Sequence, residues 1–206
     1  FHQLSNVESW TTDLSGLRPH QIANKGMVRT FQLTKSLAKM TVIDNMLLGA
    51  AEQKGESLRN ALLPSRWQKQ EKEILEKAEE LLERFKLSHM RDEYAATLSG
   101  GQRKLLEMAR ALMSEPKLIL LDEPMAGVNP VLVESLLVHI ENLRDEGVSV
   151  LFIEHDMDAI MGISDWIVVL AEGQVIAEGT PSDVSKNPAV IDAYLGSAIA
   201  EELKDV

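Results

Sequence analysis

Two carboxylates follow a continuous aliphatic run in the second half of the sequence. Asp122 and Glu123 come directly after Leu118–Leu121, and such runs are typical of strands buried on both faces of a parallel sheet. In open α/β sheets, ligands bind beyond the carboxyl ends of the strands. A carboxylate there can hold Mg²⁺ through water, and its neighbour can polarise an attacking water. Asp122 is therefore a candidate metal ligand and Glu123 a candidate catalytic residue, against the alternative of a strand that ends in two solvated acids.

A second candidate site is the sequence Leu-Ser-Gly-Gly-Gln at residues 98–102, which leads into a predicted helix over Gln102–Met113. Glycines let a ligand approach the backbone closely. The following helix offers unpaired N–H groups and the positive end of its dipole, which favours a phosphate. A Ser-Gly-Gly turn alone would more simply be a helix start. The full pentapeptide favours phosphate binding by Ser99, Gly100, Gly101 and Gln102.

Three further polar residues follow predicted elements, and each says little by itself. His155 follows a second aliphatic run, so its imidazole lies at the same sheet edge as Asp122 if the two strands are parallel neighbours. Gln32 follows a short β-type run, and its amide can ligate a metal or bind water. Asn129 precedes Pro130, a pattern typical of the first turn of a helix. For all three, a purely structural role is the simpler explanation when each is taken alone.

The elements that position these residues predict an α/β fold with a mostly parallel sheet, because strands and helices alternate in the second half. Residues 41–114 are nearly all helical, which predicts a helical subdomain inserted into an α/β core at residues 1–40 and 115–206. The predicted strands are Met27–Phe31, Leu118–Leu121, Val148–Ile153 and a hairpin of Trp166–Leu170 with Gln174–Glu178. The predicted helices are Pro19–Lys25, Thr41–Ala51, Gln68–Phe85, Gln102–Met113, Asn129 to about Arg144, a short one near Met157–Met161, Pro181–Ser185 and Ala189–Leu195.

Composition excludes several classes of function. The 206 residues include 21 Lys and Arg against 32 Asp and Glu, a net charge of −11. Nucleic acid is therefore not an expected partner, because phosphate neutralisation needs clustered basic residues. The absence of Cys excludes disulfides, thiolate nucleophiles and Cys-ligated zinc. No apolar run approaches the roughly 20 residues that span a bilayer.

The order of the motifs resembles the nucleotide-binding domain of ABC transporters, and the resemblance covers nearly the whole chain. It implies a P-loop NTPase-like core that binds ATP and Mg²⁺ and hydrolyses ATP. It also assigns the roles of the candidate residues. Gln32 is the Q-loop glutamine, residues 98–102 are the signature motif, Leu118–Asp122 is Walker B, Glu123 is the catalytic glutamate, residues 126–129 with Asn129 are the D-loop, and His155 is the switch histidine. Asp122 and Gln32 are the implied metal ligands.

A narrower resemblance is to the ATP-binding subunits of branched-chain amino acid importers, carried by Gly26–Gln32, the insertion Glu52–Lys69, residues 126–130 and the segment Ile176–Pro181. It implies a peripheral subunit at the cytoplasmic face of the membrane that couples ATP binding and hydrolysis to solute uptake. The implied partners are a second nucleotide-binding subunit, identical or related, the transmembrane permease subunits and, indirectly, a solute-binding protein. Importers of urea and amides remain an alternative, as does a non-hydrolysing fragment that acts only as an interaction module.

Two features depart from the family pattern. No Gly-x-x-x-x-Gly-Lys-Ser/Thr sequence is present, and this P-loop supplies the backbone cradle and the Lys that hold the β- and γ-phosphates. We therefore expect residues 1–206 to be a single nucleotide-binding domain truncated at its N-terminus, inactive alone, with hydrolysis in the complete protein. Ala126 and Asn129 stand where many relatives carry Ser and Asp, so we expect no carboxylate contact from this loop.

Overall fold

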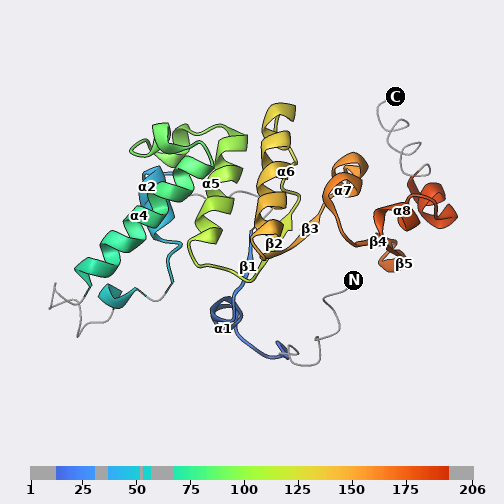
Figure 1. Cartoon of the computed structure of the whole chain (residues 1–206), viewed down its shortest axis with the longest axis horizontal. Helices are drawn as coiled ribbons and strands as arrows, with labels where there is room; N and C mark the ends of the chain where they lie inside the picture. Colours follow the sequence, from blue (N-terminus) through green and yellow to red (C-terminus); the bar gives the residue numbers. More distant parts are fainter. Residues whose placement is uncertain (1–12, 31–36, 52, 57–66, 195–206) are drawn as a thin grey trace. The chain divides into compact units, whose positions relative to one another are not determined.

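The computed structural model describes residues 13–30, 37–51, 53–56 and 67–194. The chain divides into two compact units, Phe1–Ile153 and Glu154–Val206, and each is described by itself (Figure 1). In the described ranges, no helix has the length and apolar character that crossing a membrane requires.

A parallel sheet forms the centre of the first unit. Its strands β1 (Met27–Arg29), β2 (Leu118–Asp122) and β3 (Ser149–Ile153) lie in the order β1-β2-β3. Asp122 at the end of β2 is in register with Ile153 at the end of β3. The prediction of an α/β fold with parallel strands is confirmed, and the carboxyl ends of β2 and β3 meet at one edge.

The strand predicted at Val148–Ile153 is confirmed as β3, but its aliphatic residues are not buried on both faces. Among the described strands β3 lies at the edge of the sheet, and Leu151 and Ile153 are 55% and 61% exposed. The next strand inward, β2, has Ile119 and Leu121 almost fully buried on one face. An aliphatic run indicates an apolar strand, whereas the burial of that strand depends on the elements that pack against it.

Two helices contact the strands of this sheet, one at β1 and the other at β3. The helix α1 (Pro19–Asn24) starts with Pro at its first position, and Gly26 follows it with φ of 91°. The helix α6 (Pro130–Asp145) packs against β3 and buries Leu136 and Leu143. Asn129 caps α6 as predicted, because its side chain accepts a hydrogen bond from the N–H of Leu132. The local capping chemistry therefore sets the start of this helix.

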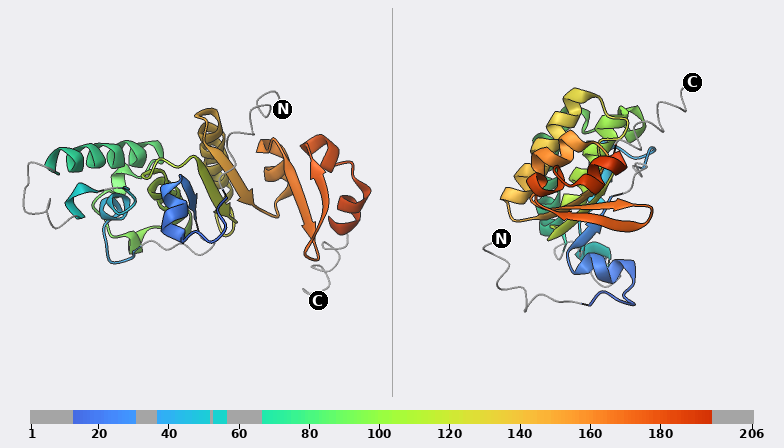
Figure 2. Two further views of the ribbon diagram at one scale, coloured as in Figure 1. Left: turned by 90° about the horizontal axis from the view of Figure 1, so that it is seen from below. Right: turned by 90° about the vertical axis from the view of Figure 1, so that its right-hand side faces the viewer.

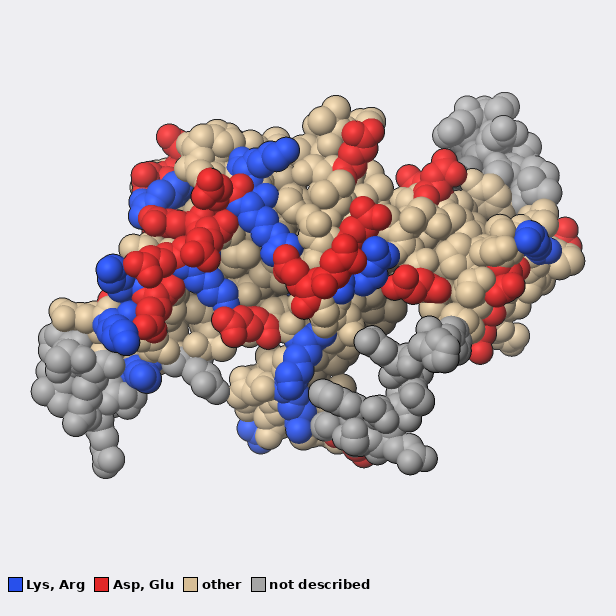
Figure 3. Space-filling view, in the orientation of Figure 1, with Lys and Arg blue, Asp and Glu red and all other residues tan. Residues whose placement is uncertain are grey.

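Helices α2 (Val42–Leu47), α4 (Gln68–Arg84) and α5 (Gly100–Leu112) pack together in the rest of the first unit, with single turns of 3₁₀ helix at Lys54–Glu56, Ser88–Met90 and Ala95–Thr97. Their shared core includes Met46, Ala78, Leu82, Leu106 and Ala109. The exposed side of α4 carries interspersed Lys, Arg and Glu (Figure 3), which fits the predicted amphipathic helix.

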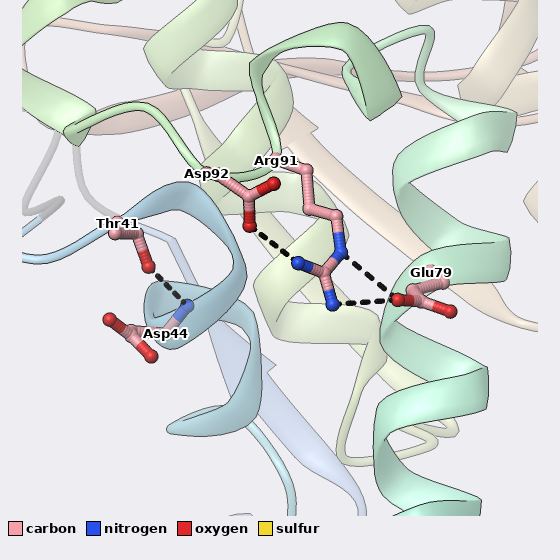
Figure 4. Close-up of polar contacts among 5 residues, drawn as sticks. All are labelled: Thr41, Asp44, Glu79, Arg91 and Asp92. Carbon is pink, nitrogen blue, oxygen red and sulfur yellow. Dashed lines mark hydrogen bonds and ion pairs between the residues drawn. The ribbon is translucent and has the colours of Figure 1, made fainter.

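Two predicted boundaries are corrected. The helix α2 ends at Leu47, earlier than the predicted Ala51. Thr41 is its cap and accepts a hydrogen bond from the N–H of Asp44 (Figure 4). The helix α5 begins at Gly100, before the predicted Gln102, because Ser99 is its cap.

An ion-pair cluster lies near the start of α2. Arg91 forms ion pairs with Glu79 of α4 and with Asp92 (Figure 4).

The second unit contains α7 (Met157–Ile163), the antiparallel strands β4 (Ile167–Ala171) and β5 (Gln174–Gly179), and α8 (Pro181–Val184) (Figure 2). Residues 188–194 are also helical. The hairpin is confirmed, and both residues of its turn, Glu172 and Gly173, have positive φ, as the favoured two-residue hairpin turn requires. Ile167, Val184 and Val190 form the buried core of this unit.

Candidate functional site

Asp122 lies at the carboxyl end of β2 and forms an ion pair with Arg29 of β1. The Nη2 atom of Arg29 donates to Oδ2 of Asp122 at 2.8 Å. The Asp122 side chain is 24% exposed, so its carboxylate is accessible from one side. Arg29 comes from a neighbouring strand and holds the carboxylate in one orientation at the sheet edge, where a ligand of an α/β sheet binds.

Glu123 follows in a left-handed backbone conformation with φ of 44°, which is uncommon for a residue with a side chain. Hydrogen bonds on both sides of the residue hold this conformation. Its N–H donates to the carbonyl of Ile153 at the end of β3, 3.0 Å away. Its own carbonyl accepts from the Nζ atom of Lys104 at 2.8 Å and from the N–H of Ala126 at 3.3 Å. Backbone strain of this kind persists only where the surroundings over-determine it, and it clusters at functional sites.

A small pocket opens beside Asp122, between the sheet and the helices α5 and α6. Its lining is Thr30, Lys104, Glu107, Met108, Leu121, Asp122, Pro124 and Leu136. Glu107 is a buried charged residue in this wall. Polar groups of β1, β2 and α5 therefore converge at the predicted carboxylate edge.

The start of α5 holds the predicted phosphate-binding residues. Ser99 and Gln102 cap the helix reciprocally: the N–H of Gln102 donates to Oγ of Ser99 at 3.2 Å, and the N–H of Ser99 donates to Oε1 of Gln102 at 2.9 Å. Gly100 is exposed, and a Cβ atom placed on it would meet only the carbonyl oxygen of Gly127, at 4.0 Å. The first N–H groups of a helix lack partners within it, so this end fits a phosphate.

Gly101 and Asn129 have structural roles that are visible without a ligand. Gly101 is buried, and a Cβ atom on it would lie 2.5 Å from Cδ1 of Leu132 and 3.4 Å from Cγ1 of Val128. Asn129 caps α6. The close packing of α5 against the start of α6 therefore explains the second glycine, and a nucleotide contact by either residue stays a prediction.

The positions of the remaining two predicted residues relative to Asp122 are not described. His155 belongs to the second unit, and its side chain is 78% exposed, with Nδ1 3.6 Å from Oε2 of Glu154. Asp156 caps α7, because its side chain accepts a hydrogen bond from the N–H of Ala159. Gln32 lies outside the described residues. The convergence of these two with Asp122 and Glu123 stays a prediction.

Two residues of this edge, Arg29 and Lys104, are not predictable as site residues from the motifs. Arg29 gave no signal beyond its place on a short strand, and its partner is 93 residues away. Lys104 gave a weak one: it is a cation on α5 between Gly101 and Leu105, both of which are buried. A charged residue next to buried positions of a helix indicates a specific partner.

The donor set fits a cation held mainly by its substrate. In the part of the chain that is described, no three His, Cys, Asp or Glu side chains cluster as a dedicated metal site. Mg²⁺ is commonly bound by one or two carboxylates together with substrate phosphates, and the partly exposed Asp122 fits that requirement.

Two family models match the chain. The first, described as ABC transporter, matches residues 5–126, and the second, described as branched-chain amino acid ATP-binding cassette transporter, matches residues 174–200.

Curated relatives and solved structures agree with these families. The chain is 48% identical to a probable branched-chain amino acid transport ATP-binding protein LivG of Archaeoglobus fulgidus, over 92% of this chain and 73% of the relative. It is 41% identical to the high-affinity branched-chain amino acid transport ATP-binding protein BraF of Pseudomonas aeruginosa, over 90% and 74%. A crystal structure of an ATP-binding cassette of an ABC transporter in its ADP conformation superposes with a TM-score of 0.74 at 41% identity, covering 90% of this chain and 74% of the other.

Proposed function

The chain belongs to the ABC transporter family of ATP-binding proteins, and from this premise we propose that it is the ATP-binding subunit of an importer for branched-chain amino acids. The proposal of the solute rests on the names of the relatives and on the match at residues 174–200. Uptake coupled to ATP hydrolysis is the activity proposed for the complete protein.

The observation that supports hydrolysis is the fixed backbone of Glu123 beside Asp122 at a parallel sheet edge. In this proposal Glu123 orients the attacking water and Asp122 holds Mg²⁺, through water or directly. Mg²⁺, when bound, neutralises charge on the phosphates. Hydrolysis of this kind depends on positioning and charge stabilisation, and a carboxylate whose backbone is held from both sides suits the first of these needs.

The remaining residues bind or sense the nucleotide in the same proposal. Ser99, Gly100 and Gly101 contact the ATP of an opposing nucleotide-binding subunit, with Gln102 supporting the turn through its cap to Ser99. Gln32 and His155 contact the γ-phosphate or its metal, and Asn129 lies in the loop at the subunit seam. These roles follow the family and are proposed for this chain residue by residue.

The proposed setting is the cytoplasmic face of the membrane. The partners are an identical or related nucleotide-binding subunit and the permease subunits, with a solute-binding protein acting through the permease. Residues 41–114 form the helical subdomain that docks against the permease. The two nucleotide-binding subunits close on ATP, and this closure drives transport through the permease subunits.

The substitution Glu123→Gln tests this function in the complete gene product that contains residues 1–206, assembled with its permease. ATP binding should persist and turnover should fall at least about 100-fold, because the variant keeps the shape of the side chain but loses the carboxylate. Glu115→Gln is a matched control, since Glu115 is also a glutamate with positive φ but lies at the far end of α5. Equal turnover in the two variants would refute the assignment.

A direct binding measurement tests whether residues 1–206 alone bind ATP. Without a P-loop sequence, this chain alone should bind ATP weakly, because the cradle for the β- and γ-phosphates is missing. Isothermal titration of the purified chain with MgATP gives the affinity. Binding in the low micromolar range would show that the other residues suffice.

A further inference from the structure

Lys104 joins both ends of the turn that carries Glu123. Its Nζ atom donates to the carbonyl oxygen of Glu123 at 2.8 Å and to that of Ala126 at 2.6 Å. Both acceptors are backbone carbonyl groups, so these two hydrogen bonds fix the path of the chain through the turn. An ammonium group donates several hydrogen bonds without accepting any, which suits a clamp on two carbonyl groups.

The clamp acts on a residue with an uncommon backbone conformation. Glu123 has φ of 44°, and its N–H is bonded to Ile153 of the neighbouring strand. On its carbonyl side, the bonds come from Ala126 within the same turn and from Lys104 of a different element. Lys104 is therefore the long-range contact that sets the carbonyl side of this left-handed residue.

The clamp also belongs to the helix that starts with the predicted phosphate-binding turn. Lys104 lies about one helical turn after Gly100, on α5. This end of α5 is itself packed on the start of α6 through Gly101 and Leu132. A displacement of the start of α5 is consequently transmitted to the carbonyl of Glu123 through one side chain.

We propose that Lys104 is a positioning residue that fixes the backbone of Glu123 and transmits the position of the start of α5 to its carboxylate. This inference rests on the proposed function, because it concerns the residue assigned to orient water. It assigns Lys104 no contact with the nucleotide. The link runs within one chain, from Ser99–Gly101 through Lys104 to the turn at residues 123–126.

The test compares Lys104→Met and Lys104→Arg in the complete gene product. Methionine keeps the volume of the stem and removes both hydrogen bonds, whereas arginine keeps the donors. For Lys104→Met we expect amide hydrogen exchange in residues 123–126 to accelerate about tenfold or more, since the clamp that opposes local opening is lost. The kcat for ATP should fall roughly 10- to 100-fold with little change in KM, because small misplacements of a catalytic group cost rates of that order. Lys104→Arg should restore most of both properties.

Lys77→Met is the matched control, because Lys77 also donates to a backbone carbonyl, that of Met113 at 3.1 Å, but at the other end of α5. It should leave exchange at 123–126 and kcat unchanged. If Lys104→Met behaves like this control, or if it folds and raises KM alone, the proposal is wrong. If Lys104→Met does not fold, Lys104→Gln takes its place with the same expected results.

A double variant separates this proposal from the proposed function. If both hold, Lys104→Met added to Glu123→Gln lowers the residual turnover no further, because the clamp acts through the lost carboxylate. A further tenfold loss would show that Lys104 acts by another route and would overturn the positioning role. If Glu123→Gln leaves turnover intact, the assigned function of Glu123 fails, while accelerated exchange in Lys104→Met still supports the clamp.

Discussion

The two ends of α5 both involve a glycine, but the surroundings of these glycines differ. At the N-terminal end Gly100 is exposed, and a Cβ atom on it would meet only the carbonyl oxygen of Gly127, at 4.0 Å. At the C-terminal end Gly49 faces the helix from the turn after α2. A Cβ atom there would lie 2.3 Å from the carbonyl oxygen of Arg110 and 3.0 Å from Cβ of Met113.

The difference separates a glycine that packing requires from one that it does not. Gly49 lets two backbones approach closely, so its role is explained by the fold. Gly100 has neither a crowded neighbourhood nor a positive φ, so the fold does not account for it. The phosphate contact that we propose for Gly100 would require this space.

The largest effect on stability is expected for Gly49→Ala. The added methyl group meets a backbone carbonyl that cannot rotate away, and overpacking of this kind costs about 1–3 kcal/mol. Chemical denaturation should show a lower midpoint with an unchanged slope. Stability equal to the wild type would mean that this contact relaxes freely, and the contrast between the two ends of α5 would be lost.

Lys77→Met should have a smaller effect at the same end. It removes the hydrogen bond from Nζ to the carbonyl of Met113 at 3.1 Å and the ion pair with Glu115 at 2.6 Å. We expect a loss of about 1 kcal/mol, since a charged donor is involved but the site is partly screened by solvent. Lys72→Met on the exposed face of α4, where the pair with Glu76 spans 3.5 Å, should cost less in the same denaturation assay.

The ion pair between Lys77 and Glu115 should make stability depend on pH, with an effect smaller than that of removing Lys77. The hydrogen bond from Lys77 and its positive charge lower the pKa of Glu115 from the ordinary value of 4.5. The pair therefore contributes stability above about pH 4.5, and the contribution is lost as the pH falls through the lowered pKa. The Glu115 side chain is 81% exposed, so the contribution is small. The stability difference between wild type and Lys77→Met should shrink below pH 4.5, whereas a growing difference would contradict the sign of the shift.

Gly100→Ala should not lower stability, but it should lower activity strongly. An alanine in the first turn of α5 has space, and it should leave the free energy of unfolding unchanged or raise it by up to about 1 kcal/mol. ATP turnover of the complete gene product should nevertheless fall at least about tenfold, because the methyl group blocks the approach of a phosphate.

Gly162→Ala in α7 is the control for that substitution, since a Cβ atom there meets nothing within 4 Å. Neither variant should be less stable than the wild type, and only Gly100→Ala should lose turnover. Full turnover of Gly100→Ala would remove the functional explanation for this glycine.

Local chemistry made several elements predictable from sequence. The Asn129-Pro130 pair marks the start of α6, and the turn at Glu172-Gly173 marks the hairpin, because both depend on residues within a few positions of each other. Ser99 is a capping residue of the same kind, but the prediction placed the start of α5 two residues late. The reciprocal hydrogen bonds between Ser99 and Gln102 place the start of the helix at Gly100, so both glycines belong to α5.

The amino-acid sequence by itself determined the order of motifs, the parallel α/β character of the fold and the placing of Asp122 and Glu123 at a strand end. These properties follow from periodicity and from caps, which act over a few residues. Only the tertiary structure decided that β3 is exposed at an edge, that Arg29 holds Asp122 and that Lys104 clamps the turn of Glu123. Each of these depends on which distant segments pack together. Hydrogen bonds between residues 19 or 93 positions apart produce no periodic pattern in the sequence, so they cannot be predicted from it.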